Sequence, residues 1–194
     1  MPTPTPTLSV HDFPIPPNLR AAAVLVPIFR DAAGELQLVM VRRTAFGVHG
    51  GQLAFPGGKP EPEDGADLWA TAQREAHEEI GLPPASVRLL AALPTVPVPS
   101  GFRISPFLGR IERPAVWQRQ VSEVDEVLEI PLRHLADPDT HTEEIWEQPG
   151  WPGPRQVPFY RVGTEGRYPL WGASYRILQP LLPRLLAGEW ALGD

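Results

Sequence analysis

The stretch between Gln52 and Leu82 constrains the fold more strongly than any other part of the sequence, because it dictates a strand, a turn and a helix in succession. A short strand over Gln52 to Phe55 ends at Pro56-Gly57-Gly58, and an acidic loop then leads into a helix expected over residues 66–80. Gly81 suits the left-handed residue that ends a helix, and the two prolines after Leu82 forbid continuation. The helix therefore has a fixed end.

One face of this helix is apolar, and glutamates border it. The stripe recurs at steps of about four residues and consists of Leu68, Trp69, Ala72, Ala76 and Ile80. At about 100° per residue, Glu75 and Glu79 fall at the edge of the stripe or partly within it, whereas Glu78 lies just outside. An unpaired charge near the buried side of a helix is costly, so Glu75 and Glu79 need a partner.

Two interpretations of the glutamates follow from the residues alone. Arg74 stands four residues before Glu78 and can pair with it, which leaves Glu75 and Glu79 for a divalent cation with oxygen ligands such as Mg²⁺. A solvated acidic helix end is the ordinary explanation of a glutamate pair, although acids at a C-terminus oppose the helix dipole. Both interpretations stay open at this level.

The remaining pattern predicts a mixed α/β (α+β) layered domain. Strands are expected at residues 20–30, 36–43, 52–55, 87–93, 102–111 and 124–130, with a hairpin formed by residues 156–162 and 167–170. Pro106 suggests that its strand is an edge strand or carries a bulge. A helical turn is expected at residues 131–135 and a second helix at residues 173–186, which Pro180 and Pro183 should kink or interrupt. Residues 1–19 are expected to form an extended Pro/Thr-rich arm before a single domain at residues 20–190.

Composition excludes several classes of protein. The net charge of −6 and the lack of a basic block argue against a nucleic-acid partner, and they allow a small anionic substrate if a metal and local arginines supply positive charge. The absence of cysteine excludes disulfides, thiolate catalysis and cysteine zinc sites. No apolar run is long enough to span a bilayer and no signal pattern opens the chain, so a cytoplasmic protein without a membrane partner is expected. The sequence leaves the oligomeric state open.

The helix and the loop before it resemble the Nudix box, G-x5-E-x7-R-E-U-x-E-E-x-G-U, in which U is apolar. The second half of the box is matched by Arg74, Glu75, Ala76, Glu78, Glu79, Gly81 and Leu82. The first half departs, because the chain from Gly58 to Arg74 is two residues longer than the pattern and Ala66 stands where an early glutamate belongs. Glu61, Glu63 and Asp64 in the longer loop are the candidates to replace that glutamate.

An upstream run resembles the signature of the coenzyme A diphosphatase branch of the Nudix family, L-L-T-x-[RT]-[SA]-x3-R-x3-G-x3-F-P-G-G. The matching positions are Leu38, Arg42, Gly51, Phe55, Pro56, Gly57 and Gly58. Met40, Arg43 and Gly47 depart from it. Ser100-Gly101-Phe102 and Leu170-Trp171-Gly172 are similar to further segments of that branch, so the resemblance covers about residues 20–186.

The resemblance implies an α/β/α sandwich with a mixed sheet and a diphosphatase that cleaves coenzyme A or its derivatives to 4′-phosphopantetheine and adenosine 3′,5′-bisphosphate. Glu75, Glu78 and Glu79 would hold Mg²⁺ or Mn²⁺, Arg74 would orient them, and one glutamate would accept the proton of the attacking water. A Nudix hydrolase of another nucleoside diphosphate derivative, such as ADP-ribose, is the alternative. A catalytically inactive nucleotide-binding module is a third possibility, and the retention of all three glutamates and Arg74 argues against it.

The resemblance and the residue types also give candidates for substrate binding, namely Arg42, Arg43, Gly57, Gly58, Lys59, Ser100, Phe102 and Arg103. The glycines would let backbone approach a phosphate or a metal, or simply form a tight turn. The cations would hold phosphates or lie solvated at the surface, and Phe102 would stack on adenine or pack in the core. Glu123 and Glu126 lie where Nudix proteins often bring a further acid towards the metal, with an exposed strand face as the alternative.

Overall fold

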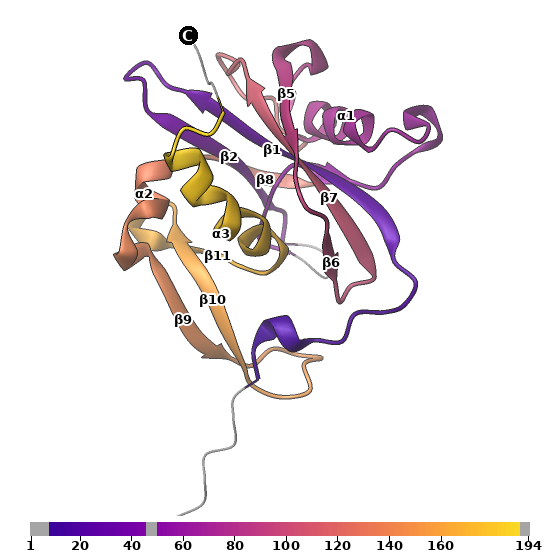
Figure 1. Cartoon of the computed structure of the whole chain (residues 1–194), viewed down its shortest axis with the longest axis vertical. Helices are drawn as coiled ribbons and strands as arrows, with labels where there is room; N and C mark the ends of the chain where they lie inside the picture. Colours follow the sequence, from indigo (N-terminus) through magenta and orange to yellow (C-terminus); the bar gives the residue numbers. More distant parts are fainter. Residues whose placement is uncertain (1–7, 46–49, 191–194) are drawn as a thin grey trace, which may run out of the picture.

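A mixed sheet lies between helices on its two faces (Figure 1). The computed structural model describes residues 8–45 and 50–190. Helix α1 (Leu68–Ile80) covers one face of an eight-stranded sheet, and α2 (Leu132–Ala136) and α3 (Gly172–Leu186) cover the other. This arrangement confirms the predicted α/β/α sandwich.

The large sheet has the strand order β3-β2-β1-β7-β5, with β4 paired to β1, β6 to β7 and β8 to β2. Its strands are β1 (Arg20–Arg30), β2 (Leu36–Arg43), β3 (Leu53–Ala54), β4 (Gly57–Gly58), β5 (Val87–Ala92), β6 (Val96–Val98), β7 (Phe102–Ile111) and β8 (Val124–Pro131). β1 and β7 run parallel, and the other pairs are antiparallel. The parallel pair sets Arg20 beside Phe102, although 81 positions separate the two residues in the sequence numbering.

Two hydrophobic cores form because side chains alternate along the central strands. On β1, Ala23 and Leu25 pack into the core beneath α1, whereas Val26 and Ile28 pack into the core beneath α2 and α3. The α1 stripe predicted from periodicity is confirmed, since Ala72, Ala76 and Ile80 are fully buried there and Leu68 and Trp69 pack against the same core.

The ends of α1 agree with the sequence signals. Asp67 caps the first turn, accepting a hydrogen bond from the backbone N–H of Trp69 at 2.9 Å. Gly81 is left-handed, with φ 70° and ψ 24°, and its N–H donates to the carbonyl of His77. The Leu82 N–H reaches the carbonyl of Ala76, and the Leu82 side chain is fully buried. These contacts fix the orientation of the last turn, which carries the glutamates.

A second, three-stranded sheet joins β9 (His141–Trp146), β10 (Arg155–Val162) and β11 (Tyr168–Leu170). The hairpin of β10 and β11 was predicted, whereas β9 and β6 were not. The described part of the N-terminal arm, residues 8–19, contains a 3₁₀ turn at Val10–Asp12 and pairs with β10 through Ser9 and Gln156.

The expected edge strand at Pro106 and the expected interruption of the helix at Pro180 and Pro183 are wrong. Pro106 does not mark an edge strand, because β7 lies between β1 and the strands β5 and β6. Pro106 lies at the point where the strand paired with β7 changes from β5 to β6. Its missing N–H therefore removes little of the hydrogen bonding between these strands. Pro180 and Pro183 do not interrupt α3, which runs to Leu186. Both prolines are on the exposed side of α3, and the buried leucines on its other side hold the helix in place.

Candidate active site

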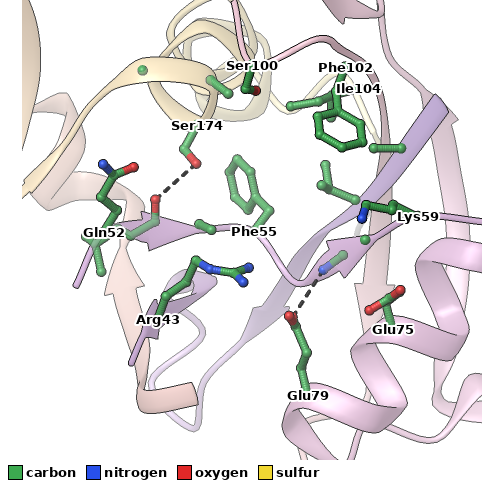
Figure 2. A pocket seen from close by; sticks show the side chains of 18 of the residues that line it. Arg43, Gln52, Phe55, Lys59, Glu75, Glu79, Ser100, Phe102, Ile104 and Ser174 are labelled. Carbon is green, nitrogen blue, oxygen red and sulfur yellow. Dashed lines mark hydrogen bonds between the residues drawn. The ribbon is translucent and has the colours of Figure 1, made fainter. Parts of the chain in front are cut away.

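A pocket of about 610 Å³ opens where α1, the β3–β4 segment, the start of β7 and the start of α3 meet (Figure 2). Glu75 and Glu79 from α1 line one side of the pocket, and Gln52 and Ser174 lie across from them. Glu61 and Glu123 line it as well. The pocket therefore brings together segments that are widely separated in the sequence.

Glu79 is the most deeply buried acid of the pocket, with 4% of its surface exposed. Its Oε2 accepts a hydrogen bond from the Gly57 N–H at 3.1 Å. Burial raises the pKa of Glu79 to about 8, with Glu75 and Glu123 adding to the rise and the Gly57 N–H and Arg43 opposing it. Without further positive charge, this carboxyl is poorly stabilised as an anion.

Glu75 lies against the glycine pair of β4. A Cβ on Gly58 would clash with the Glu75 carboxylate, and a Cβ on Gly57 would clash with the β1 backbone at Ala23 and Val24. The two glycines therefore allow β1, β4 and α1 to approach one another closely. Burial also raises the pKa of Glu75, against the lowering effect of Arg74.

Arg74 is held mainly by Asp64, the acid of the lengthened loop. Its Nε and Nη2 donate to the two oxygens of Asp64, each at 3.0 Å, and Nη2 also reaches the Lys59 carbonyl at 2.9 Å. Hydrogen bonds from Arg74 hold the pKa of Asp64 well below its usual range. Of the three loop acids proposed to replace the early glutamate, Asp64 is the one that contacts Arg74.

The structure does not bring Glu78 into the pocket. Its side chain is 55% exposed and pairs with Arg74 at 2.9 Å, as predicted from their spacing. Arg74 also contacts Glu75 at 3.2 Å. Arg74 therefore lies between the three acids Asp64, Glu75 and Glu78, and it sets the position of the Glu75 side chain.

The donor chemistry of the pocket suits a hard divalent cation. Within residues 8–45 and 50–190, no three His, Cys, Asp or Glu side chains converge as a ready-made metal site. Glu75 and Glu79 nevertheless face one pocket, and burial raises the pKa of each, although Arg74 acts on Glu75 and Arg43 on Glu79 in the opposite direction. Mg²⁺ commonly takes one or two protein carboxylates and completes its shell with waters and phosphates. Glu75 and Glu79 fit that requirement, with Glu123 as a further acid nearby.

Positive charge in the pocket comes from Arg20, Arg43 and Lys59. The Arg20 guanidinium lies 4.2 Å from the ring centroid of Phe102, and the Lys59 ammonium lies 5.8 Å from it. Ser100 lies close to this ring at the rim of the pocket (Figure 2). These groups can hold an anionic ligand that also offers a flat ring.

Strand alternation explains which predicted cations stay outside. Phe102 and Ile104 line the pocket, so Arg103 between them is exposed on the other face of β7. Arg42 pairs with Asp125 and Glu126 and lies over the Tyr168 ring, away from the pocket that Arg43 lines. Glu126 is therefore paired with Arg42 and does not line the pocket. Gly47, which departs from the upstream signature, lies outside the described residues.

Several lining residues were not among the substrate-binding candidates taken from the sequence, namely Arg20, Gln52 and Ser174, whereas Phe55 was noted there as part of the upstream signature. Arg20 opens the first strand, and only its parallel pairing with Phe102 brings it to the pocket. Ser174 donates to the Leu53 carbonyl at 3.3 Å and thus ties α3 to β3. No local motif signals either contact, because both depend on chain segments far apart in the sequence.

By fold and site, this chain is an α/β/α protein with a pocket lined by both carboxylates and cations. The family model of the NUDIX domain matches residues 19–162, and the chain belongs to the Nudix hydrolase family. It is therefore a hydrolase that acts on diphosphate bonds. The family generally acts with divalent metal ions.

Relatives and solved structures agree with this assignment. A protein of Salmonella paratyphi B named "Uncharacterized Nudix hydrolase NudL" is 36% identical over 172 residues, covering 84% of this chain and 82% of its own. A MutT/nudix family protein from Enterococcus faecalis superposes with a TM-score of 0.55 at 15% identity, over 91% of this chain and 65% of its own. The Nudix hydrolase RenU from M. smegmatis superposes with a TM-score of 0.53 at 19% sequence identity. The superposition covers 68% of this chain and 81% of RenU. Among residues 8–45 and 50–190, none of the helices has the length and apolar composition that a membrane span requires.

Proposed function

We propose that this hydrolase cleaves the diphosphate of coenzyme A or a CoA derivative, releasing 4′-phosphopantetheine and adenosine 3′,5′-bisphosphate. One observation carries the proposal: three segments that resemble the CoA-cleaving branch contribute to the same pocket. Phe55, Gly57 and Gly58 come from the first segment, Ser100 and Phe102 from the second, and Trp171 and Gly172 from the third. Their convergence beside Glu75 and Glu79 supports a shared role in holding one substrate.

Glu75 and Glu79 would hold Mg²⁺ or Mn²⁺, with Glu78 close by on the same helix. When bound, a divalent ion supplies positive charge that neutralises the diphosphate and favours attack on phosphorus. Arg74, fastened by Asp64, holds the Glu75 carboxylate in position. Water attacks one phosphorus, the bridging P–O bond breaks, and a pocket carboxylate accepts the proton of the water.

The adenosine half of the substrate would lie at Phe102. Its ring offers a stacking surface for adenine, and Arg20 and Lys59 beside it supply charge for the 3′-phosphate. A charge-assisted contact of this kind discriminates well against a substrate that lacks the phosphate. Among the cations near the ring, Arg20 is the closer one.

Initial rates with Mg²⁺ on CoA, dephospho-CoA and ADP-ribose test the proposal, with products identified chromatographically. We expect CoA to have the highest kcat/KM, and Arg20→Gln to reduce its advantage over dephospho-CoA by about tenfold or more, as for the loss of a hydrogen bond to a charged group. Arg103→Gln is the matched control, since it removes a guanidinium that does not line the pocket. Equal efficiency on CoA and dephospho-CoA would refute recognition of the 3′-phosphate. A strong preference for ADP-ribose would refute the CoA assignment.

A further inference from the structure

A groove of about 640 Å³ lies at the end of the large sheet opposite the active-site pocket. In the parallel pair of β1 and β7, Phe102 is level with Arg20 at the pocket, and Arg110 is level with Ile28 at the groove. At about 3.3 Å per residue, the part of β7 from Phe102 to Arg110 spans roughly 26 Å. Figure 1 shows β5 beside this end of β7 and β6 beside the other. The groove is therefore separate from the pocket.

Arginines dominate the charged lining of this groove. Among the residues that the structure describes, the lining contains four arginines and one acid, namely Arg30, Arg88, Arg110, Arg113 and Glu112. The whole chain carries a net charge of −6, so the positive charge gathered here runs against the overall balance. Such a concentration of one sign of charge attracts counter-ions to one place on the surface.

Two of these arginines stand directly opposite each other. In the antiparallel pair of β5 and β7, Arg88 is the register partner of Arg110. Side chains at such positions leave the same face of the sheet with Cβ atoms about 5 Å apart, and like charges there destabilise the pairing. An anion that contacts both guanidiniums would offset this cost.

Arg30 adds a third cation on the neighbouring strand. Ile28 and Leu108 both pack into the core beneath α2 and α3. Arg30 and Arg110 stand two positions further along β1 and β7, so strand alternation directs them to that same side of the sheet. Because Ile28 is level with Arg110, Arg30 is its diagonal neighbour, at roughly 7–8 Å. The adjacent strands β1, β7 and β5 thus each place one arginine on one face.

Contacts inside the protein compensate only part of this charge. Arg113 pairs with Glu129 at 2.7 Å. Arg30 donates from Nη1 to the Gly34 carbonyl at 2.8 Å, which is a dipole and carries no net charge. Within residues 8–45 and 50–190, neither Arg30 nor Arg110 forms an ion pair. Arg110 is also half-buried, which makes its charge more costly without a partner.

The spacing of the arginines decides which anion fits the groove. A guanidinium binds phosphate oxygens through two parallel N–H bonds. One such fork satisfies a single phosphate, whereas three forks on one face match an anion with several phosphates in a row. The aromatic ring of the groove, Phe29, is 3% exposed and offers no surface on which a base could stack. The lining therefore favours the phosphate chain itself.

We infer that the arginine groove, defined by Arg30, Arg88 and Arg110, is a binding site for a linear polyphosphate, either free or as the phosphate chain of a nucleotide. A volume of about 640 Å³ lies within the range of small-ligand sites. Among the described residues, the groove and the active-site pocket share no lining residue. The inference consequently does not depend on which diphosphate the active-site pocket cleaves.

Calorimetric titration of the full-length protein in metal-free buffer with tripolyphosphate, ATP and inorganic phosphate tests the groove. We expect tripolyphosphate to bind about tenfold tighter than phosphate or more, since it can bridge several guanidiniums. Arg110→Gln should weaken tripolyphosphate binding by about tenfold or more, as for the loss of hydrogen bonds to a charged group. Equal affinity for ATP is expected if the ligand is a free chain, and tighter binding of ATP if it is a nucleotide. Either result supports the groove when it depends on Arg110.

Arg103→Gln is the matched control, because Arg103 is an exposed cation at the other end of the same strand. Arg20→Gln reports in the same way on the active-site pocket. Without ligand, Arg110→Gln should melt at the wild-type temperature or slightly above it, because one of two like charges facing each other is removed. If Arg110→Gln melts lower, Arg30→Gln at the exposed end of β1 supplies the same test of binding.

Melting curves give an independent readout. Tripolyphosphate should raise the melting temperature of the wild type and leave that of Arg110→Gln almost unchanged. Loss of binding in Arg20→Gln but not in Arg110→Gln would place the anion in the active-site pocket and overturn the groove. Equal losses in Arg110→Gln and Arg103→Gln would show unspecific attraction to positive charge, which overturns it as well. The same holds if tripolyphosphate does not bind, or binds no tighter than phosphate.

Discussion

The carboxyl group of Glu79 combines deep burial with few compensating contacts. Its hydrogen-bond partner is the Gly57 N–H, and Arg43 acts on it at longer range. An ionised carboxylate in such a place costs stability unless a cation is bound, so a purely structural role would favour a glutamine here. We therefore regard Glu79 as retained for chemistry at the expense of stability.

Replacing Glu79 by glutamine separates these two roles. Glutamine keeps an oxygen that can accept from the Gly57 N–H and removes the buried charge, so we expect an unchanged or higher melting temperature in EDTA. We expect kcat in Mg²⁺ to fall by about 10² or more, as when one charge-stabilising group is lost from an active site. Steady-state kinetics and thermal melts on the same preparation check both expectations.

Glu63→Gln is the control for this substitution, because Glu63 is an exposed glutamate in the acidic loop that precedes α1. It should leave both the rate and the melting temperature close to those of the wild type. A Glu79→Gln enzyme that retains activity within a few-fold of the wild type would remove Glu79 from the mechanism.

Helix α1 could be predicted in detail because its signals are local. The αL glycine Gly81, the apolar stripe and the spacing of Arg74 and Glu78 all act within one or two turns, and the structure shows each of them. The loop before the helix could be predicted only to contain a substitute acid. The choice of Asp64 depends on the three-dimensional path of the loop, which brings its carboxylate to Arg74 and to the Thr71 hydroxyl at 3.0 Å.

Asp64→Asn tests whether this loop acid positions Arg74 and Glu75 on α1. The amide cannot accept two charge-assisted bonds from Arg74, so we expect a melting temperature several degrees lower and a clear loss of kcat with a smaller change in KM. Asp67→Asn is the matched control, because asparagine caps a helix about as well as aspartate. Wild-type kcat in Asp64→Asn would show that Arg74 is held adequately by its other partners.

Sequence patterns failed where the outcome depends on the neighbouring strand. Arg42 and Arg43 are adjacent cations in one strand, yet pairing of β2 with β8 directs Arg42 to Asp125 and Glu126. Pro106 carries the usual signal of an edge strand, but the exchange of β5 for β6 beside it accommodates the missing donor. Such effects arise from tertiary pairing, which propensity and periodicity do not encode.

At the scale of the whole molecule, the parallel pairing of β1 with β7 assembles the site. It sets Arg20 beside Phe102, and antiparallel pairing of β4 with β1 sets Gly57 and Gly58 against α1. The sheet thus forms one wall of the pocket, and the acids whose pKa burial raises, Glu75 and Glu79, lie on α1. A cation at this place would bind the folded chain and would find no such site in the unfolded one.

Thermal stability should therefore depend on metal and pH together. In EDTA, the folded state holds a proton on Glu79 up to about pH 8, whereas the unfolded chain releases it near its ordinary pKa of 4.5. Stability in EDTA thus falls as pH rises through this window, by at most about 1.4 kcal/mol per pH unit for one proton. The pKa of Glu75 is raised as well, so Glu75 contributes to the pH dependence of stability in the same direction. Millimolar Mg²⁺ or Mn²⁺ should raise the melting temperature, and increasingly so between pH 6.5 and 8, because metal and proton compete for the same carboxylates.

The Glu79→Gln variant isolates this effect from other titrations. The groups that act on Glu79 are Glu75 and Glu123, which raise its pKa, and Arg43 with the Gly57 N–H, which lower it. Burial lowers the pKa of His11, so this residue makes stability rise with pH, opposite to the effect of Glu79. The contribution of His11 is confined to the range below about pH 6.5. In Glu79→Gln we therefore expect melts in EDTA that vary less between pH 6.5 and 8, together with a smaller gain from metal. Superimposable wild-type melts in EDTA and in Mg²⁺ at pH 8, with no heat of metal binding in calorimetry, would show that the glutamates of α1 are an ordinary acidic helix end.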